Sequence, residues 1–106
     1  MHKSVLLQEC LENLKLNNNS IAVDCTLGYG GHSSEILKRV SNGFLYAFDQ
    51  DMEAINSSRE RLSKIADNYE IIYSNFYHLK EELEKRNINK VNAILFDLGV
   101  SSPQLD

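Results

Sequence analysis

Residues 21–32 read IAVDCTLGYGGH, a short apolar run followed by a glycine-rich segment. Ile21-Ala22-Val23 has the length and composition of a buried β-strand, and Gly28 to His32 is predicted as a loop that opens a helix. Glycine permits positive φ and a close ligand approach, and the first helical turn presents unpaired N–H groups. The segment therefore predicts a cofactor site at this strand-to-helix junction. A plain tight turn is the alternative.

A dinucleotide-binding site is one form that this junction could take. Its fingerprint, G-x-G-x-x-G, would begin at Gly28 and Gly30 and require a third glycine at the position of Ser33. The match is partial, and a single partial match is weak evidence. NAD therefore stays open as a ligand at this point.

Strands and helices alternate along the rest of the chain. The predicted strands are 21–23, 44–48, 71–73 and 91–96, and the predicted helices are 4–15, 33–40, the segment after Asp51, and a segment from Leu79 to near Arg86. Residues 44–48 are continuously apolar, which is typical of a strand covered on both faces. Such alternation predicts an α/β fold, doubly wound, with a parallel sheet of about four strands and flanking helices.

The length of 106 residues allows one domain. The chain stops soon after the fourth predicted strand, so we expect that strand to form an exposed edge of the sheet unless another segment pairs with it. No apolar run approaches the ~18 residues of a membrane span, and the N-terminal apolar run is too short for a secretory signal. We therefore expect a cytoplasmic location and no membrane partner.

Charge and cysteine content limit the classes of partner. The net charge is −4 and basic residues alternate with acidic ones in the predicted helices, which is typical of a solvated face. If RNA is the substrate, most of its binding surface lies elsewhere. Cys10 and Cys25 are interpreted as two buried thiols, and the histidines at 2, 32 and 78 are too dispersed to predict a metal site.

Three polar positions follow the later predicted strands. Asp49 ends the second strand, where a carboxylate can accept hydrogen bonds from both ribose hydroxyls of an adenosine. Asp51 competes for this role, but a helix N-cap is its better interpretation. Asn75-Phe76 follows the third strand, so Phe76 either lies near an adenine ring or belongs to the core. Asp97 follows the fourth strand, at the expected ligand crevice.

These segments together resemble the RsmH/MraW family of methyltransferases. The resemblance covers nearly the whole chain and is most specific at Asp97–Asp106. The matching segments are His2–Glu9, Asp24–Ser33, Phe48–Asp51, Asn75-Phe76 and Asp97–Asp106.

The resemblance implies a Rossmann-like fold and transfer of a methyl group from S-adenosylmethionine (SAM) to N4 of a cytidine in small-subunit ribosomal RNA. It implies SAM contacts at Gly30, Gly31, His32, Asp49, Phe76, Asp97 and Gln104. Asp24 and Gly28 are expected to shape the pocket. Asp97 is also the expected catalytic contact to the substrate amine, since an acceptor there can take up the positive charge developing on nitrogen. No metal is required.

Two departures from expected patterns qualify this reading. Many amino methyltransferases carry Asp/Asn-Pro-Pro-aromatic after the fourth strand, and this chain has Asp97-Leu98-Gly99-Val100 instead. Family members are also about three times as long and contain an inserted helical domain. Residues 1–106 are therefore interpreted as the N-terminal SAM-binding part, which we expect to be inactive alone.

Two other functions stay open. An NAD-dependent oxidoreductase domain is favoured by Gly28, Gly30 and Asp49 and disfavoured by Ser33 and the Asp97 segment. A non-catalytic interaction module would use the glycines only for turns, and it predicts no adenosine-containing ligand.

Overall fold

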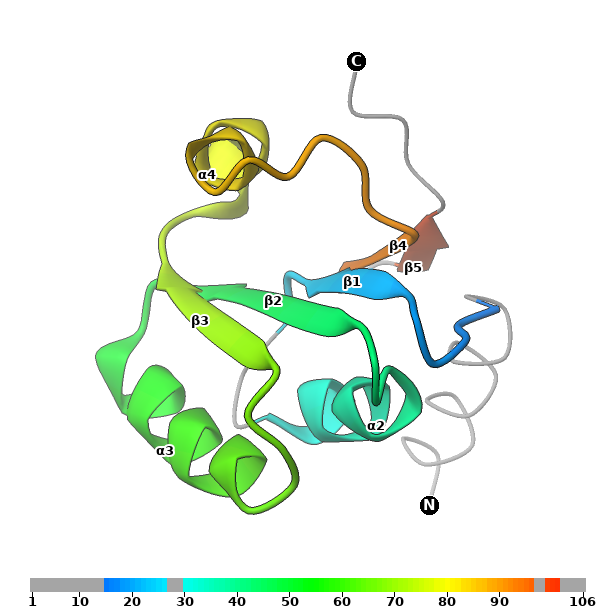
Figure 1. The fold of residues 1–106 in the computed structure, drawn as a ribbon. Helices are drawn as coiled ribbons and strands as arrows, with labels where there is room; N and C mark the ends of the chain where they lie inside the picture. Colours follow the sequence, from blue (N-terminus) through cyan, green and yellow to red (C-terminus); the bar gives the residue numbers. More distant parts are fainter. Residues whose placement is uncertain (1–14, 27–29, 97–98, 102–106) are drawn as a thin grey trace.

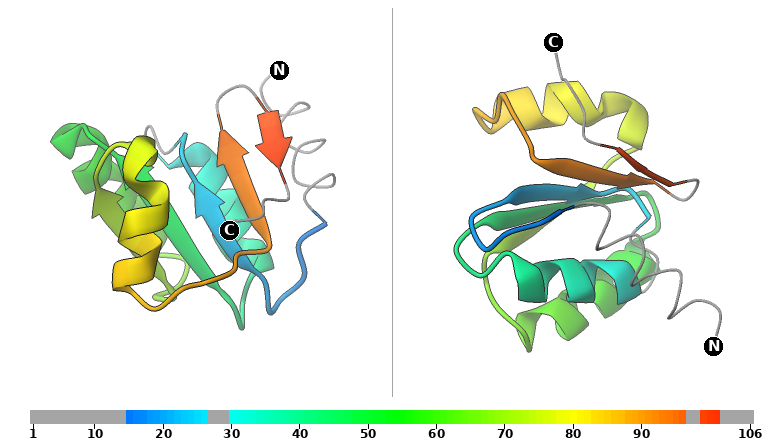
Figure 2. Two further views of the ribbon diagram at one scale, coloured as in Figure 1. Left: turned by 90° about the horizontal axis from the view of Figure 1, so that it is seen from above. Right: turned by 90° about the vertical axis from the view of Figure 1, so that its right-hand side faces the viewer.

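The computed structural model describes residues 15–26, 30–96 and 99–101, which form a five-stranded sheet with helices on both faces (Figure 1). The elements are β1 (Ile21–Asp24), α2 (Gly31–Arg39), β2 (Phe44–Asp49), α3 (Met52–Ser63), β3 (Tyr69–Tyr73), the 3₁₀ helix η1 (Phe76–His78), α4 (Leu79–Lys85), β4 (Ala93–Phe96) and β5 (Gly99–Ser101). Helices α2 and α3 cover one face and α4 lies on the other (Figures 1 and 2).

The sheet has the strand order β3-β2-β1-β4-β5. Strand β1 pairs in parallel with β2 on one side and with β4 on the other, and β3 extends the parallel set beyond β2. The four predicted strands therefore form one parallel sheet, as alternation with helices requires. The predicted α/β fold class is confirmed.

The fourth predicted strand is not an edge of the sheet, because another segment does pair with it. Strand β5 pairs antiparallel with β4, placing Ile94 opposite Ser101 and Phe96 opposite Gly99. An antiparallel partner needs only a two-residue connection, so the few residues after β4 are enough to cover its edge. Within the described residues, the outer strands are β3 and β5.

Most predicted elements occur with shifted ends. Strand β3 begins at Tyr69, earlier than predicted, and β4 begins at Ala93, later than predicted. The delay in β4 has a local cause, because Asn92 exchanges hydrogen bonds with Ile21: its N–H donates to the Ile21 carbonyl and its side-chain oxygen accepts from the Ile21 N–H, both at 2.7 Å. The predicted helix 4–15 lies outside the described residues except for Lys15.

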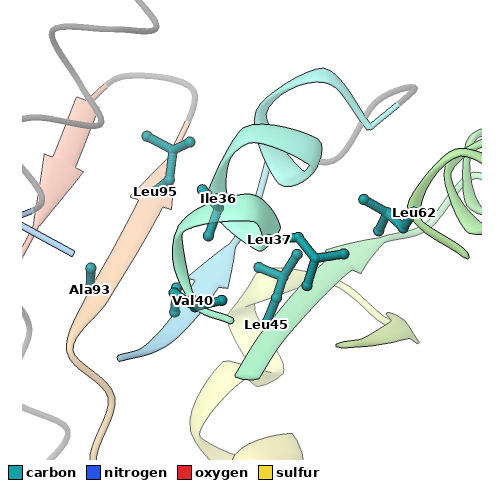
Figure 3. Close-up of a cluster of buried hydrophobic side chains, with 8 residues drawn as sticks. Ile36, Leu37, Val40, Leu45, Leu62, Ala93 and Leu95 are labelled. Carbon is teal, nitrogen blue, oxygen red and sulfur yellow. The ribbon is translucent and has the colours of Figure 1, made fainter. Parts of the chain in front are cut away.

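Both faces of the sheet carry a buried apolar cluster. The cluster under α2 and α3 contains Ala22, Ile36, Leu37, Val40, Leu45, Leu62, Ala93 and Leu95, most of which are labelled in Figure 3. The cluster under α4 contains Val23, Tyr46, Phe48, Ile72, Leu83 and Ile94. Because successive residues of β2 enter opposite clusters, its continuous apolar sequence is explained by burial on both faces.

An ion-pair network fastens the C-terminal end of α4 to the sheet. The Arg86 guanidinium donates from Nε and Nη2 to the two carboxylate oxygens of Glu70 on β3, at 2.9 and 2.8 Å. Its Nη1 donates to a carboxylate oxygen of Glu82 one turn earlier, at 2.9 Å. These hydrogen bonds raise the pKa of Arg86 further above its ordinary value. The two-pronged geometry fixes the orientation of α4 as well as its distance from β3.

No helix in the described ranges has the length and apolar character needed to cross a membrane.

The turn between α2 and β2 lies directly against the segment before β1. Phe44 N–H donates to the Ser20 carbonyl at 3.1 Å, and Asn42 N–H donates to the Asn18 carbonyl at 2.7 Å. A Cβ at Gly43 would overlap the Ser20 carbonyl oxygen, which is backbone and has little freedom to move. Gly43 is therefore required by close packing.

We expect Gly43→Ala to lower the free energy of unfolding by about 1–3 kcal/mol, since the backbone must shift to relieve the overlap. Urea unfolding followed by circular dichroism measures the change. Asn42→Ala is the matched control, because the exposed Asn42 side chain leaves the backbone hydrogen bond in place, and we expect a change within about 0.5 kcal/mol. Equal effects for the two variants would contradict the packing explanation.

Candidate cofactor-binding site

An open cavity of about 330 Å³ lies at the C-terminal ends of β1, β2 and β3. It is lined by Cys25, Thr26, Phe48, Asp49, Gln50, Asp51, Ser74, Asn75 and Phe76. Parallel strands bring their carboxyl ends to one edge of a sheet, which is where ligands bind in folds of this type. The volume is at the lower end of the range of about 300–1,000 Å³ for small-molecule sites.

Asp49 is the last residue of β2, opposite Tyr73 of β3, and lines this cavity. Its Oδ1 accepts a hydrogen bond from the Asp51 N–H at 2.7 Å, which holds the carboxylate in place. A carboxylate has room for about four hydrogen bonds, so the bond from Asp51 does not by itself prevent contacts with further donors. The position fits the predicted ribose acceptor.

Asp51 also lines the cavity, but it has a structural task. Its Oδ1 accepts from the Glu53 N–H at 2.9 Å, and its backbone is extended with φ −101° and ψ 111°. These are the features of an N-cap residue. The N-cap interpretation of Asp51 is therefore confirmed.

The segment after β3 presents aromatic rings at the rim of the cavity. Asn75 caps η1 by accepting from the Tyr77 N–H at 2.9 Å. Phe76 is 43% exposed, packs edge-on against Phe96 with ring centroids 5.7 Å apart, and stacks on Tyr77 at 4.8 Å. Phe76 is thus a half-covered ring at the rim, and its core alternative is wrong.

Asp24 lies beneath the site as a fully buried carboxyl group. It accepts hydrogen bonds from the Thr26 N–H at 2.7 Å, the Thr26 hydroxyl at 2.6 Å and the Ser33 hydroxyl at 2.6 Å. Burial raises the pKa of this carboxyl above its ordinary value, and the hydrogen bonds from Ser33 and Thr26 oppose the rise. The network ties β1 to the start of α2.

The glycine-rich segment enters α2 at Gly30. This residue is the N-cap, with φ 88°, in the left-handed region that favours glycine. A Cβ there would lie 3.2 Å from the Ser58 hydroxyl oxygen on α3, so Gly30 also lets α2 and α3 approach closely. At Gly31 the nearest atom to an added Cβ would be Arg61 Nη1, at 3.9 Å. The two neighbouring glycines therefore meet different constraints.

The structure brings only some of the predicted contacts to the cavity. Asp49 and Phe76 line it, whereas Gly30, Gly31 and His32 are not among its lining residues. His32 is connected to it through Thr26, whose hydroxyl oxygen lies 3.4 Å from His32 Nδ1. Gly28, Asp97 and Gln104 lie outside the described residues, as does Cys10.

Sequence reasoning missed five lining residues: Cys25, Thr26, Phe48, Gln50 and Ser74. Phe48 lies within β2, next to Asp49, and the other four follow a strand by one or two positions, which is the signal that could have found them. Among the described residues, no group of three or more His, Cys, Asp and Glu side chains could hold a metal ion.

A family profile and individual relatives of this chain indicate the same protein family. The sequence profile of the MraW methylase family matches residues 1–106. Ribosomal RNA small subunit methyltransferase H of Spiroplasma kunkelii is 58% identical over 106 residues, which cover 99% of this chain and 34% of that protein. The protein of the same name from Mycoplasmopsis agalactiae is 52% identical over 105 residues, covering 99% of this chain and 35% of that protein. The chain thus spans about a third of the length of the curated relatives it matches.

Solved structures agree on the fold. An rRNA methylase from Streptococcus thermophilus aligns with a TM-score of 0.60 and 28% identity, covering 85% of this chain and 48% of that chain. A Streptococcus mutans protein solved in complex with SAH aligns with a TM-score of 0.63 and 27% identity, covering 76% of this chain and 43% of that chain. The predicted Rossmann-like methyltransferase fold is therefore confirmed.

Gly30 and Gly31 form a matched pair for testing the backbone requirement. We expect Gly30→Ala to lower the free energy of unfolding by about 1–3 kcal/mol, because alanine is strained at positive φ. Gly31→Ala should leave it unchanged or raise it by up to about 1 kcal/mol, because alanine favours a helix. Chemical denaturation of both variants measures the difference, and equal destabilisation would argue against the left-handed cap.

The buried Asp24 carboxyl should make stability depend on pH. Its folded-state pKa lies above the ordinary value of 3.8, so the folded protein binds more protons in the window between the two values. The stability due to protonated Asp24 is complete below that window and is lost as the pH rises through it. Asp24→Asn lacks this titration.

We therefore expect the unfolding free energy of the wild type, minus that of Asp24→Asn, to fall as the pH rises from about 3.5 towards neutrality. Urea titrations of both proteins across this range provide the measurement. A difference that grows with pH would mean that the hydrogen bonds from Thr26 and Ser33 outweigh burial.

Proposed function

The chain belongs to the MraW methylase family, and we propose that it forms the SAM-binding part of an enzyme that methylates N4 of a cytidine in small-subunit ribosomal RNA. The observation that carries this proposal is the cavity at the ends of β1, β2 and β3, with the Asp49 carboxylate and the Phe76 ring on its lining. These two groups match the ribose and adenine of one adenosyl moiety.

The charge of the site supports SAM over a dinucleotide. The described lining of the cavity includes the carboxylates of Asp49 and Asp51 and no Lys or Arg, and the Asp24 carboxyl lies beneath it. Acidic groups in a half-enclosed site favour a ligand with positive charge. SAM carries a sulfonium and an ammonium group, whereas NAD would bring the negative pyrophosphate to this edge.

Ser33 weakens the dinucleotide alternative further. The third glycine of the dinucleotide fingerprint allows close packing of helix and strand. Here the fully buried Ser33 occupies that position and donates its hydroxyl hydrogen to Asp24 at 2.6 Å. The junction is held together by a side-chain hydrogen bond.

The substrate end of the site is proposed from chain order. Strand β4 ends at Phe96, next to β1 in the sheet, and Asp97 is the following residue. A carboxylate there would accept a hydrogen bond from the cytosine amine and stabilise the positive charge that develops as the nitrogen attacks the methyl group. Alignment of the amine with the sulfonium methyl would supply much of the remaining acceleration. Gln104 is a further proposed SAM contact.

The proposed partner is small-subunit ribosomal RNA, which implies a cytoplasmic site of action. The acidic charge of −4 provides little attraction for phosphate groups. RNA affinity therefore has to come mainly from regions beyond these 106 residues.

Calorimetric titration with SAM tests the cofactor. We expect saturable binding that Asp49→Ala weakens at least tenfold, because the ribose hydroxyls lose a charged acceptor worth about 1.5–3 kcal/mol. Asp51→Ser, which preserves an N-cap side chain, should change affinity much less. Asp67→Asn, an exposed change near the far end of α3, is the control.

Competition with NADH separates the two adenosine-containing ligands. SAM binding that NADH does not displace supports the proposal, and tight NADH binding would overturn it in favour of the oxidoreductase. A folded protein that binds neither ligand would favour the non-catalytic module.

A further inference from the structure

A short chain of hydrogen bonds runs from a buried carboxyl group to the half-buried His32. Asp24 Oδ1 accepts from both the N–H and the hydroxyl of Thr26, at 2.7 and 2.6 Å. The Thr26 hydroxyl oxygen in turn lies 3.4 Å from His32 Nδ1. Thr26, the middle member of this chain of hydrogen bonds, lines the cavity of the proposed cofactor site.

The direction of these bonds follows from the donor inventory. A threonine hydroxyl has one hydrogen, and here it points to Asp24 Oδ1. The ionised Asp24 carboxylate has no hydrogen to donate, so both of its oxygens accept, Oδ2 from Ser33 and Oδ1 from Thr26. The Thr26 oxygen can therefore only accept from His32, and Nδ1 must carry the hydrogen.

We infer that Thr26 is a positioning residue that holds neutral His32 in the tautomer with its hydrogen on Nδ1, so that Nε2 accepts a hydrogen bond from the ammonium group of SAM. A neutral imidazole has one donor and one acceptor nitrogen, and a hydrogen bond at one nitrogen sets the role of the other. The ligand half of this inference rests on the proposed function.

The ammonium group is identified by elimination among the donors of SAM. Its ribose hydroxyls are assigned to Asp49 and its adenine to the rim at Phe76. The remaining N–H donors are those of the amino-acid end. A bare imidazole nitrogen repels a carboxylate, so Nε2 selects the ammonium over the carboxylate of that end.

Nuclear magnetic resonance of the ligand-free protein tests the tautomer directly. Long-range proton–nitrogen correlations distinguish the protonated from the bare ring nitrogen, with His2→Gln and His78→Gln used to assign the three histidines. At a pH where imidazole is neutral, we expect His32 in the Nδ1–H form in the wild type and in Thr26→Ser. In Thr26→Val, which has nearly the same shape but no hydroxyl, the preference should be lost.

A wild-type His32 in the Nε2–H form would overturn the inference. This measurement is made on the wild-type protein and does not depend on whether any variant folds. Retention of the Nδ1–H form in folded Thr26→Val would also overturn it, since the hydroxyl would then have no part in the choice.

Titration with SAM and with its analogue lacking the amino group tests the ligand half. We expect Thr26→Val to weaken SAM binding about tenfold, Thr26→Ser to restore it to within about twofold, and the analogue to show no effect of Thr26→Val. Equal weakening for both ligands would overturn the ammonium contact. Failure of the wild type to bind SAM would defeat the proposed function. The measured tautomer of His32 would still show whether Thr26 is a positioning residue.

Discussion

Strand β1 is hydrogen-bonded to a parallel strand on each side, and this pairing aligns the ends of β1, β2 and β4 at one edge of the sheet. Because β1 is central, its last residue, Asp24, ends in the interior of the protein, where a carboxyl group requires hydrogen-bond partners. Thr26 and Ser33 provide them from the following loop and from α2. The same pairing brings the ends of β2 and β3 to the edge where β1 ends, which forms the cavity.

The hydrogen bonds that Thr26 and Ser33 donate to the buried Asp24 hold this edge of the sheet together. A buried polar group without a partner destabilises a fold by roughly 1–3 kcal/mol, so the three hydrogen bonds to Asp24 stabilise the junction as well as shaping it. The junction between β1 and α2 is therefore held by the side chains of Thr26 and Ser33.

The glycine pair at the start of α2 shows how structural and ligand roles overlap. Gly30 is needed for a left-handed backbone and for the close approach of Ser58, whereas neither constraint applies at Gly31. A glycine near a ligand is often ascribed to the ligand alone. Here the fold accounts for Gly30, whereas the role of Gly31 as a cofactor contact is a proposal.

The sequence alone determined the parallel α/β fold, the junction after β1, the N-cap at Asp51 and the position of Asp49 at the end of β2. These features rest on local patterns: apolar runs, alternation of strand and helix lengths, and polar residues directly after strands. A resemblance in ordered motifs added the family, which the profile match over residues 1–106 then confirmed.

Only the tertiary structure decided the contacts between distant segments. These include the pairing of β5 with β4, the burial of Asp24 against Ser33, the rim position of Phe76 against Phe96, and the contact of Thr26 with His32. Each depends on the strand order of the sheet and on the distance between packed helices. Spacing along the chain specifies neither, because residues that are far apart in sequence meet only once the sheet has formed.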